Sequence, residues 1–214
     1  MFKFAFIFIY IFIVFLISII YKRFNPNNKE LLRKIIHIGI GPLIPFAKFL
    51  EIDQNSALCF TGIISILTFI NYQSKLFPTI EDVDRKSYGT LFYCISLFIL
   101  IYLYWNKDPT SLIAGFFIMT FGDGFAGLIG KNFKSKSWKF FGQKKSLFGT
   151  MTMYISSLII VFGLSYYQKY SLDFNLFTIA LISTILEQLS ILGIDNLIVP
   201  VSAAFLFNYF ITGL

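Results

Sequence analysis

Asp123 carries the strongest chemical signal in the sequence. It lies in FGDGFAGLIGK, residues 121–131, inside or at the end of an apolar run, and Gly122 and Gly124 flank it. A carboxylate is costly among apolar residues, so it is a candidate functional group. It has a purpose there if it holds a Mg²⁺ ion that also binds a polyphosphate. Glycines at three-residue steps, ending at Gly130, let a ligand or a neighbouring helix approach closely.

The segment KKSLFG, residues 144–149, follows closely and is suited to an anion. Lys144 and Lys145 precede Ser146, a candidate N-cap for the next helix. Two cations, free backbone N–H groups and the positive end of a helix dipole favour phosphate. The simpler interpretation is a glycine packing seam followed by a basic cytoplasmic loop, but that interpretation leaves Asp123 unexplained.

Two earlier segments also hold polar groups beside apolar runs. Arg33, His37 and Gly41 recur at steps of four in ELLRKIIHIGIGP, which places a cation, an imidazole and a gap on one helix face. His37 is the only histidine, and both a structural and a functional role stay open for it. Arg85 precedes Ser87, a candidate cap, in EDVDRKSYGTLFY, where a charged loop with a capping turn is the simpler interpretation.

The fourth segment is EQLSILGIDNLIVP, residues 187–200, in which Glu187 and Asp195 bracket a break at Gly193. A tight polar loop would account for much of it. Glu187, however, lies several residues inside an apolar run, which a loop does not require. Four clusters far apart in sequence are most economically explained by one shared site.

Composition shows which elements must position these groups. The chain has 214 residues, of which 57% are hydrophobic and 14% charged, and its mean hydropathy is +0.74. A soluble domain needs about a quarter of its residues charged, so that class is excluded. In such a chain the net charge of +7 is a topology signal and not a sign of nucleic-acid binding. Cys59 and Cys94 lie in apolar runs, which argues against a disulfide framework or a thiolate metal site.

The sequence predicts an all-α, multi-pass membrane protein with seven or eight transmembrane helices in a single domain, residues 1–214. The polar stretch 131–146 is too short to fold alone and is expected to be a loop or a pair of turns. The second and third apolar runs are short for a bilayer and are expected to be tilted or broken. The apolar runs cover about residues 2–20, 35–50, 57–70, 88–105, 110–130, 147–166, 174–194 and 197–214.

Basic residues predict the orientation. Lys22 and Arg23 follow the first apolar run, which places the N-terminus outside and the next loop in the cytoplasm. Threading eight spans from that start puts 14 of the 18 basic residues on the cytoplasmic side. All four polar clusters then lie on that side, so the expected active site faces the cytoplasm.

At these motifs the chain resembles the CTP-dependent isoprenoid alcohol kinases, which include phytol, farnesol and dolichol kinases and are related to a CTP-dependent diacylglycerol kinase. The resemblance covers nearly the whole chain. Five motifs carry it in order: ELLRKIIH, RKSYGTLFY, GDGFAGLIGK, KSLFG and DNLIVP with its preceding glutamate.

The resemblance implies transfer of the γ-phosphoryl group of CTP to a lipid alcohol in the bilayer, with phytol the leading candidate. It implies Mg²⁺ held mainly by Asp123, assisted by Glu187 or Asp195, while His37 accepts the alcohol proton or orients a phosphate. Charge on the transferred group would be neutralised by Arg33, Arg85 and Lys131. The expected nucleotide-binding residues are Lys131, Lys144, Lys145, Ser146, Gly122, Gly124, Gly130 and Gly149.

Other classes stay open. A CTP-dependent diacylglycerol kinase or a phosphatidate cytidylyltransferase is the next alternative, although the Lys-Asp pair that typifies the latter is found only at Lys107 and Asp108, on the opposite face. A small transporter would use Asp123 and Glu187 to carry an ion, but it usually shows a repeat. A structural membrane subunit leaves all four clusters unexplained. The oligomeric state is not indicated by the sequence.

Overall fold

The computed structural model describes residues 2–25, 29–74, 88–140 and 142–213. Within these ranges the chain is helical apart from one short hairpin and the connecting loops. Its elements are α1 (Phe2–Phe24), α2 (Lys29–Gly39), α3 (Leu43–Phe49), α4 (Gln54–Ser74), α6 (Gly89–Tyr104), α7 (Pro109–Phe117), the π-helical η1 (Ile118–Asp123), α8 (Gly124–Asn132), β1 (Ser137–Phe140), β2 (Gln143–Ser146), α9 (Leu147–Gln168), α10 (Asn175–Gln188), the 3₁₀ turn η2 (Ile191–Gly193), α11 (Asp195–Phe207) and the π-helical η3 (Asn208–Thr212).

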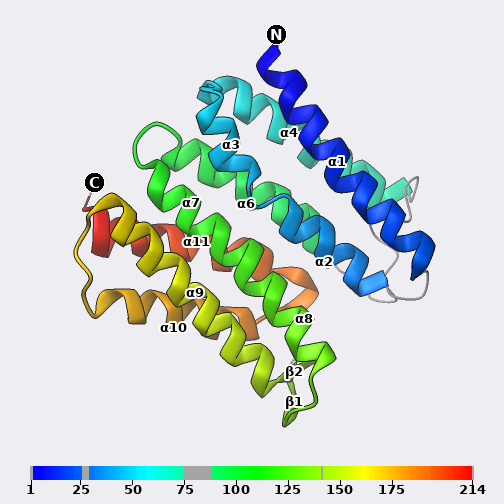
Figure 1. Cartoon of the computed structure of the whole chain (residues 1–214), viewed down its shortest axis with the longest axis vertical. Helices are drawn as coiled ribbons and strands as arrows, with labels where there is room; N and C mark the ends of the chain where they lie inside the picture. The colour runs from blue at the N-terminus through cyan, green and yellow to red at the C-terminus, as the bar shows by residue number, and fades with distance from the viewer. Residues whose placement is uncertain (1, 26–28, 75–87, 141, 214) are drawn as a thin grey trace.

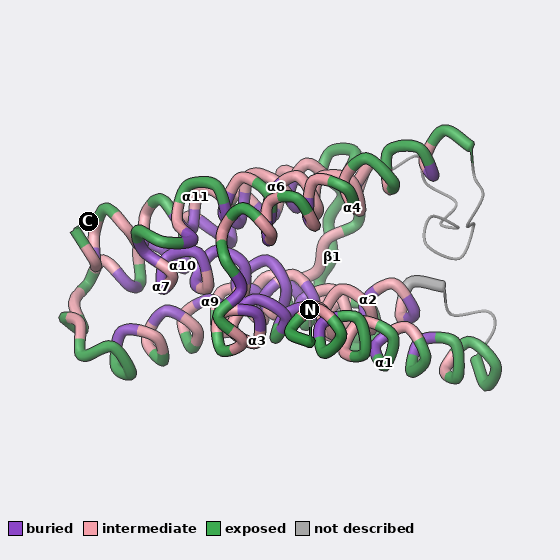
Figure 2. The backbone as a smooth tube through the Cα atoms, turned by 90° about the horizontal axis from the view of Figure 1, so that it is seen from above, coloured by how far each residue is buried: buried purple, intermediate pink, exposed green. Residues whose placement is uncertain are grey.

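The helices run side by side and form two layers. Figure 1 shows α1 and α4 along one edge of the molecule and α9 and α10 along the other, with α7 and α8 between them. In Figure 2, α4, α6 and α11 lie in one layer and α1, α2 and α9 in the other. Buried residues concentrate between the layers, and the outer helices carry exposed apolar side chains such as Phe6 and Ile159. That distribution is typical of helices whose outer faces contact lipid.

Five helices in the described part of the chain are long and apolar enough to cross a bilayer. They are Phe2–Phe24, Gln54–Ser74, Pro109–Asn132, Leu147–Gln168 and Asp195–Thr212. Two shorter apolar helices, Gly89–Tyr104 and Asn175–Gln188, accompany them. The prediction of an all-α membrane protein is confirmed, whereas the prediction of seven or eight spans is not.

One local expectation is met and one needs correction. The apolar run at 35–50 is broken, as expected, because α2 ends at Gly39 and α3 begins only at Leu43. At 11 and 7 residues, each piece is too short to span a bilayer. The polar stretch 131–146 is more ordered than a loop, since β1 and β2 pair as an antiparallel hairpin with Lys139 opposite Lys144.

A continuous central helix positions the key carboxylate. It begins with Asp108 as the cap of α7, whose carboxylate accepts a hydrogen bond from the Ser111 N–H at 3.1 Å, and it runs through η1 into α8. Gly115 lets it pack tightly against α11, since a Cβ at that position would lie 2.3 Å from the Pro200 carbonyl oxygen. The π-helical turn places Asp123 at its last position, and such turns are frequent at functional sites.

Candidate active site

Asp123 lies at the centre of a polar cluster between α2 and α8. Lys34 Nζ donates to Asp123 Oδ2 at 2.6 Å and to the Asp123 carbonyl oxygen at 3.0 Å. Lys34 is only 4% exposed, and it passes over Gly127, where a Cβ would lie 2.6 Å from its side chain. The absence of a side chain at Gly127 therefore leaves the space through which Lys34 reaches the carboxylate of Asp123.

His37 approaches the same carboxylate from α2, which is outside the spanning helices. Its Nε2 lies 3.4 Å from Asp123 Oδ2 and 3.1 Å from the Met119 carbonyl oxygen. Burial lowers the pKa of His37 to about 4, and the charge of Lys34 adds to that effect while Asp123 opposes it. The imidazole is therefore neutral near pH 7. Since a carbonyl only accepts, Nε2 carries the proton that it donates to Met119, and Nδ1 is the nitrogen that can accept one.

A second buried carboxylate joins the cluster from α10. Lys145 Nζ donates to the Glu187 side chain and, at 2.8 Å, to the Glu187 carbonyl oxygen. The other side-chain oxygen, Oε2, accepts from Gln188 Nε2 at 2.9 Å, and that amide nitrogen also reaches Thr150 Oγ1 at 3.2 Å. Lys145 thus connects the hairpin to α10, and Thr150 connects α9 to α10.

Asp123, Glu187 and Asp195 form a group that fits a divalent cation. One carboxylate oxygen from each lies within 4.8 Å of the others. Asp123 and Glu187 have lysine partners, but Asp195 Oδ1 is buried without a hydrogen-bond partner among the described residues. Three carboxylates this close repel one another, and an unpartnered buried oxygen is costly. A hard cation that prefers oxygen ligands would offset the repulsion and give Asp195 Oδ1 a partner.

These groups line a polar cavity of about 390 Å³ that opens beside the hairpin. Its walls combine the three carboxylates with cations and with small residues at which the helices approach closely. The residues that line it are Arg33, Lys34, Gly89, Thr90, Asp123, Ala126, Gly127, Gly130, Lys131, Gln143, Lys144, Lys145, Ser146, Gly149, Thr150, Glu187, Ser190, Gly193, Asp195 and Asn196.

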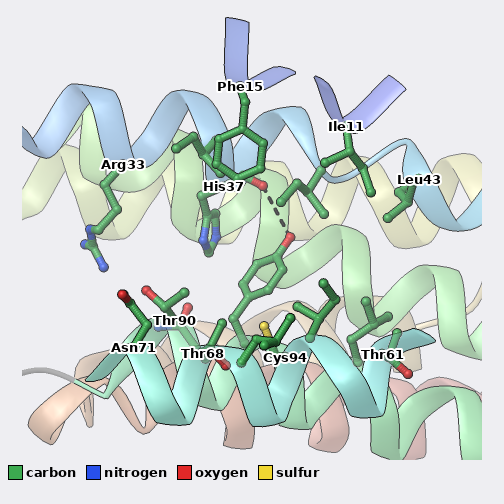
Figure 3. Close-up of a pocket in the computed structure, with 18 of the residues that line it drawn as sticks. Ile11, Phe15, Arg33, His37, Leu43, Thr61, Thr68, Asn71, Thr90 and Cys94 are labelled. Carbon is green, nitrogen blue, oxygen red and sulfur yellow. Dashed lines mark hydrogen bonds between the residues drawn. The ribbon is translucent and has the colours of Figure 1, made fainter. Parts of the chain in front are cut away.

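An apolar cavity of about 380 Å³ adjoins it. It lies between α2 and α4 and is lined mainly by aliphatic and aromatic side chains from α1, α2, α4 and α6 (Figure 3). His37 lines it, and Tyr93 donates a hydrogen bond to the His37 carbonyl oxygen at 3.3 Å. The residues that line both cavities, called the border below, are Arg33, Gly89, Thr90 and Asn196.

The structure brings most of the predicted site residues together. Arg33, Lys131 and the three carboxylates line the polar cavity, as do Lys144, Lys145 and Ser146 of the hairpin. Ser146 is the N-cap of α9, as expected, and its Oγ accepts from the Gly149 N–H at 3.2 Å. Arg85 lies outside the described residues.

The predicted glycines divide into two groups. Gly130 and Gly149 line the polar cavity and contact each other, since a Cβ on Gly130 would lie 3.2 Å from Gly149 Cα. Gly122 and Gly124 lie at helix contacts, where a Cβ would meet Met153 and Ile38 respectively at less than 3.0 Å. Their position indicates close helix packing around the site.

Sequence reasoning missed Lys34, Thr90 and Asn196 as site residues. Lys34 follows Arg33 directly and stands three residues before His37, a helical spacing that could have identified it. Asn196 lies beside Asp195, and its Oδ1 is buried without a hydrogen-bond partner in the described part of the chain. Thr90 gave no signal, because one threonine near a helix start is unremarkable in sequence.

Comparison with known proteins assigns the chain to a family. Phytol kinase of Synechocystis sp. is 33% identical over 195 residues, which cover 89% of this chain and 84% of that protein. A probable chloroplastic phytol kinase of Triticum aestivum is 27% identical over 81% of this chain and 65% of its own length. Dolichol kinase of Saccharomyces cerevisiae is 28% identical over 77% of this chain and 30% of that longer protein. No protein-family model and no solved structure matches significantly. On the strength of the cyanobacterial relative, the chain belongs to the isoprenoid alcohol kinase family of the phytol and dolichol kinases.

Proposed function

We propose that this kinase transfers the γ-phosphoryl group of CTP to the hydroxyl of phytol dissolved in the membrane. The observation that carries the proposal is the border, where a charged cavity suited to a nucleotide adjoins an apolar cavity suited to a hydrocarbon tail. Phytol is favoured because the relatives that match over most of this chain are named phytol kinases. CTP is favoured by the resemblance of the sequence motifs.

The polar cavity is proposed to hold the triphosphate. Lys144 and Lys145 stand on the hairpin, and the Gly149 N–H belongs to the first turn of α9, so cations and a helix N-terminus face the same space. Asp123, Glu187 and Asp195 would hold a Mg²⁺ ion, which supplies charge neutralisation to the phosphates. Phosphoryl transfer needs mainly alignment and charge stabilisation, which this set of residues provides.

The hydroxyl is proposed to lie at the border. There Asn196 offers an unpartnered amide oxygen, while His37 in the adjoining apolar cavity offers Nδ1, so either group can accept the single hydroxyl proton. The alcohol oxygen forms a bond to the γ-phosphorus, the bond from that phosphorus to the bridging oxygen breaks, and CDP leaves. The hydroxyl proton passes to His37 or to water. Arg33, which lines both cavities, is placed to stabilise charge on the transferred group.

The alcohol is proposed to enter sideways from the bilayer. Leu67 and Ile70 line the apolar cavity and are about half exposed on the lipid-facing side of α4, so the cavity wall is open there. The polar cavity lies at the end of the molecule that carries the basic hairpin. By the positive-inside rule this end faces the cytoplasm, with the N-terminus outside, and α6 and α10 cross the bilayer with the five longer helices.

The test uses purified protein in detergent or liposomes with Mg²⁺ and CTP labelled separately at the α and γ positions. The acceptors are phytol, farnesol, dolichol, diacylglycerol and phosphatidate. Transfer of the γ label to phytol, abolished in Asp123→Asn, is the expected result. Transfer of the α label to phosphatidate identifies a cytidylyltransferase, a preference for diacylglycerol identifies a different lipid kinase, and equal use of ATP removes the claim on CTP.

A further inference from the structure

The apolar cavity ends at a thin wall of side chains. A smaller apolar cavity of about 30 Å³ lies directly beyond it. Four residues line both cavities, and together they are called the partition: Leu43, Phe60, Thr61 and Leu97. Leu43, Thr61 and Leu97 are each at most 8% exposed, so the partition belongs to the packed interior.

The partition lies at the opposite end of the cavity from the border. Figure 3 shows Arg33 and Thr90 at one end of the cavity and Thr61 at the other. Along α4, Asn71, near the polar end, is eleven positions after Phe60 in the partition. At the rise of an α-helix this corresponds to roughly 16 Å.

We propose that the partition sets the length of the isoprenoid chain that the enzyme accepts. A C–C bond of about 1.5 Å makes the four-bond isoprenoid repeat roughly 5 Å long when extended. A depth of roughly 16 Å therefore holds about three repeats, and a fourth repeat can extend towards the border with the hydroxyl group. This length corresponds to alcohols of about 15 to 20 carbons. The inference rests on the proposed function, because the alcohol tail must lie in this cavity.

The partition, and not the small cavity behind it, limits the length of the alcohol tail. About 30 Å³ is the share of one water molecule in the liquid, too little for another isoprenoid repeat. Phe60 and Leu97 stand on α4 and α6, facing the cavity from two helices, so shortening either one joins the two spaces. Thr61 is held by its own helix through a hydrogen bond to the Ala57 carbonyl oxygen at 2.8 Å.

The test measures kcat/KM for geraniol, farnesol, geranylgeraniol and two longer prenols, of 25 and 30 carbons, with CTP and Mg²⁺. For the wild type we expect a fall of at least about tenfold beyond 20 carbons, the discrimination typical of a filled apolar pocket. Phe60→Ala is expected to reduce that fall to less than about threefold for the 25-carbon prenol, and Leu97→Ala repeats the test from the other helix if Phe60→Ala does not fold. Ile64→Phe, which fills the cavity one turn from Thr61, is expected to move the optimum to shorter alcohols.

Ile63→Ala is the matched control, since Ile63 is on the same helix, is 53% exposed and lines neither cavity. It is expected to keep the wild-type length profile. An unchanged profile in folded Phe60→Ala and Leu97→Ala overturns the inference, and so does a wild type that uses 30 carbons as well as 20, because the tail then leaves sideways. A wild type that phosphorylates neither these prenols nor phytol contradicts the proposed function itself, a distinct result.

Discussion

Substitution of Asp195 can separate the electrostatic cost of three close carboxylates from their contribution to metal binding. Its Oδ1 lacks a hydrogen-bond partner among the described residues, and its carboxylate lies within 4.8 Å of those of Asp123 and Glu187. Two like unit charges 4.8 Å apart repel by about 3.5 kcal/mol at an effective dielectric of 20, and Lys34 and Lys145 offset part of that repulsion. We therefore expect Asp195→Asn to stabilise the metal-free protein by about 1–2 kcal/mol.

The assay is thermal unfolding in detergent with and without Mg²⁺, beside phosphorylation of phytol. At a hundredfold excess of Mg²⁺ over its dissociation constant, the wild type should gain about 2.7 kcal/mol, whereas Asp195→Asn should gain little and lose at least about a hundredfold in kcat/KM. Glu51→Gln, a highly exposed acid far from the site, should behave as wild type. The reasoning is refuted if Asp195→Asn unfolds earlier without Mg²⁺ or keeps the full stabilisation by Mg²⁺.

Three further changes test the surrounding structure. Lys34→Met leaves the Asp123 carboxylate without its lysine and should destabilise the metal-free protein by about 3–5 kcal/mol in thermal unfolding, whereas Lys107→Met, an exposed lysine at the other end, should change little. Gly130→Ala places a Cβ 2.7 Å from Ser146 Oγ and should cost about 1–3 kcal/mol and reduce kcat/KM, while Gly163→Ala, with open space around it, should do neither. Burial alone would raise the pKa of Asp108, but hydrogen bonds from Ser111, Asn208 and Thr212 hold that pKa below its ordinary value. The stabilisation from the ionised Asp108 is present above about pH 4 and is lost as pH falls through the lowered pKa. The difference in melting temperature between wild type and Asp108→Asn should therefore shrink towards about pH 3. A difference that widens towards about pH 3 contradicts this prediction.

Apolar runs predicted the helices well where lipid decides the structure. The runs at 2–20 and 147–166 became α1 and α9 with small changes at their ends, because long apolar segments have few alternatives to a helix in a membrane. The run at 35–50 is short for a bilayer and was expected to be tilted or broken, and it is broken, with an amphipathic helix that ends at Gly39 and a new helix from Leu43. Pro42, directly before the new helix, has no backbone N–H with which to continue the first one.

The site was partly predictable for a different reason. Asp123 and Glu187 are charged groups in apolar runs and stand out in any sequence of this kind. Lys34 did not stand out, because a lysine in a basic segment resembles a topology signal until the structure shows it buried against Asp123. The apolar cavity could not be predicted at all, since its walls are ordinary Ile, Leu and Phe residues from four helices whose packing the sequence does not specify.

A two-substrate kinetic experiment tests most directly the central claim that alcohol and nucleotide meet at the border. It compares Lys144→Ala, in the polar cavity, Ile40→Trp, in the apolar cavity, and Asn196→Ala, at the border. We expect a higher KM for CTP in Lys144→Ala and a higher KM for phytol in Ile40→Trp. In Asn196→Ala we expect a fall in kcat of roughly tenfold or more, with smaller changes in either KM. If Asn196→Ala leaves kcat unchanged while Ile40→Trp raises the KM for CTP and not for phytol, the two substrates do not occupy these cavities and the account is wrong.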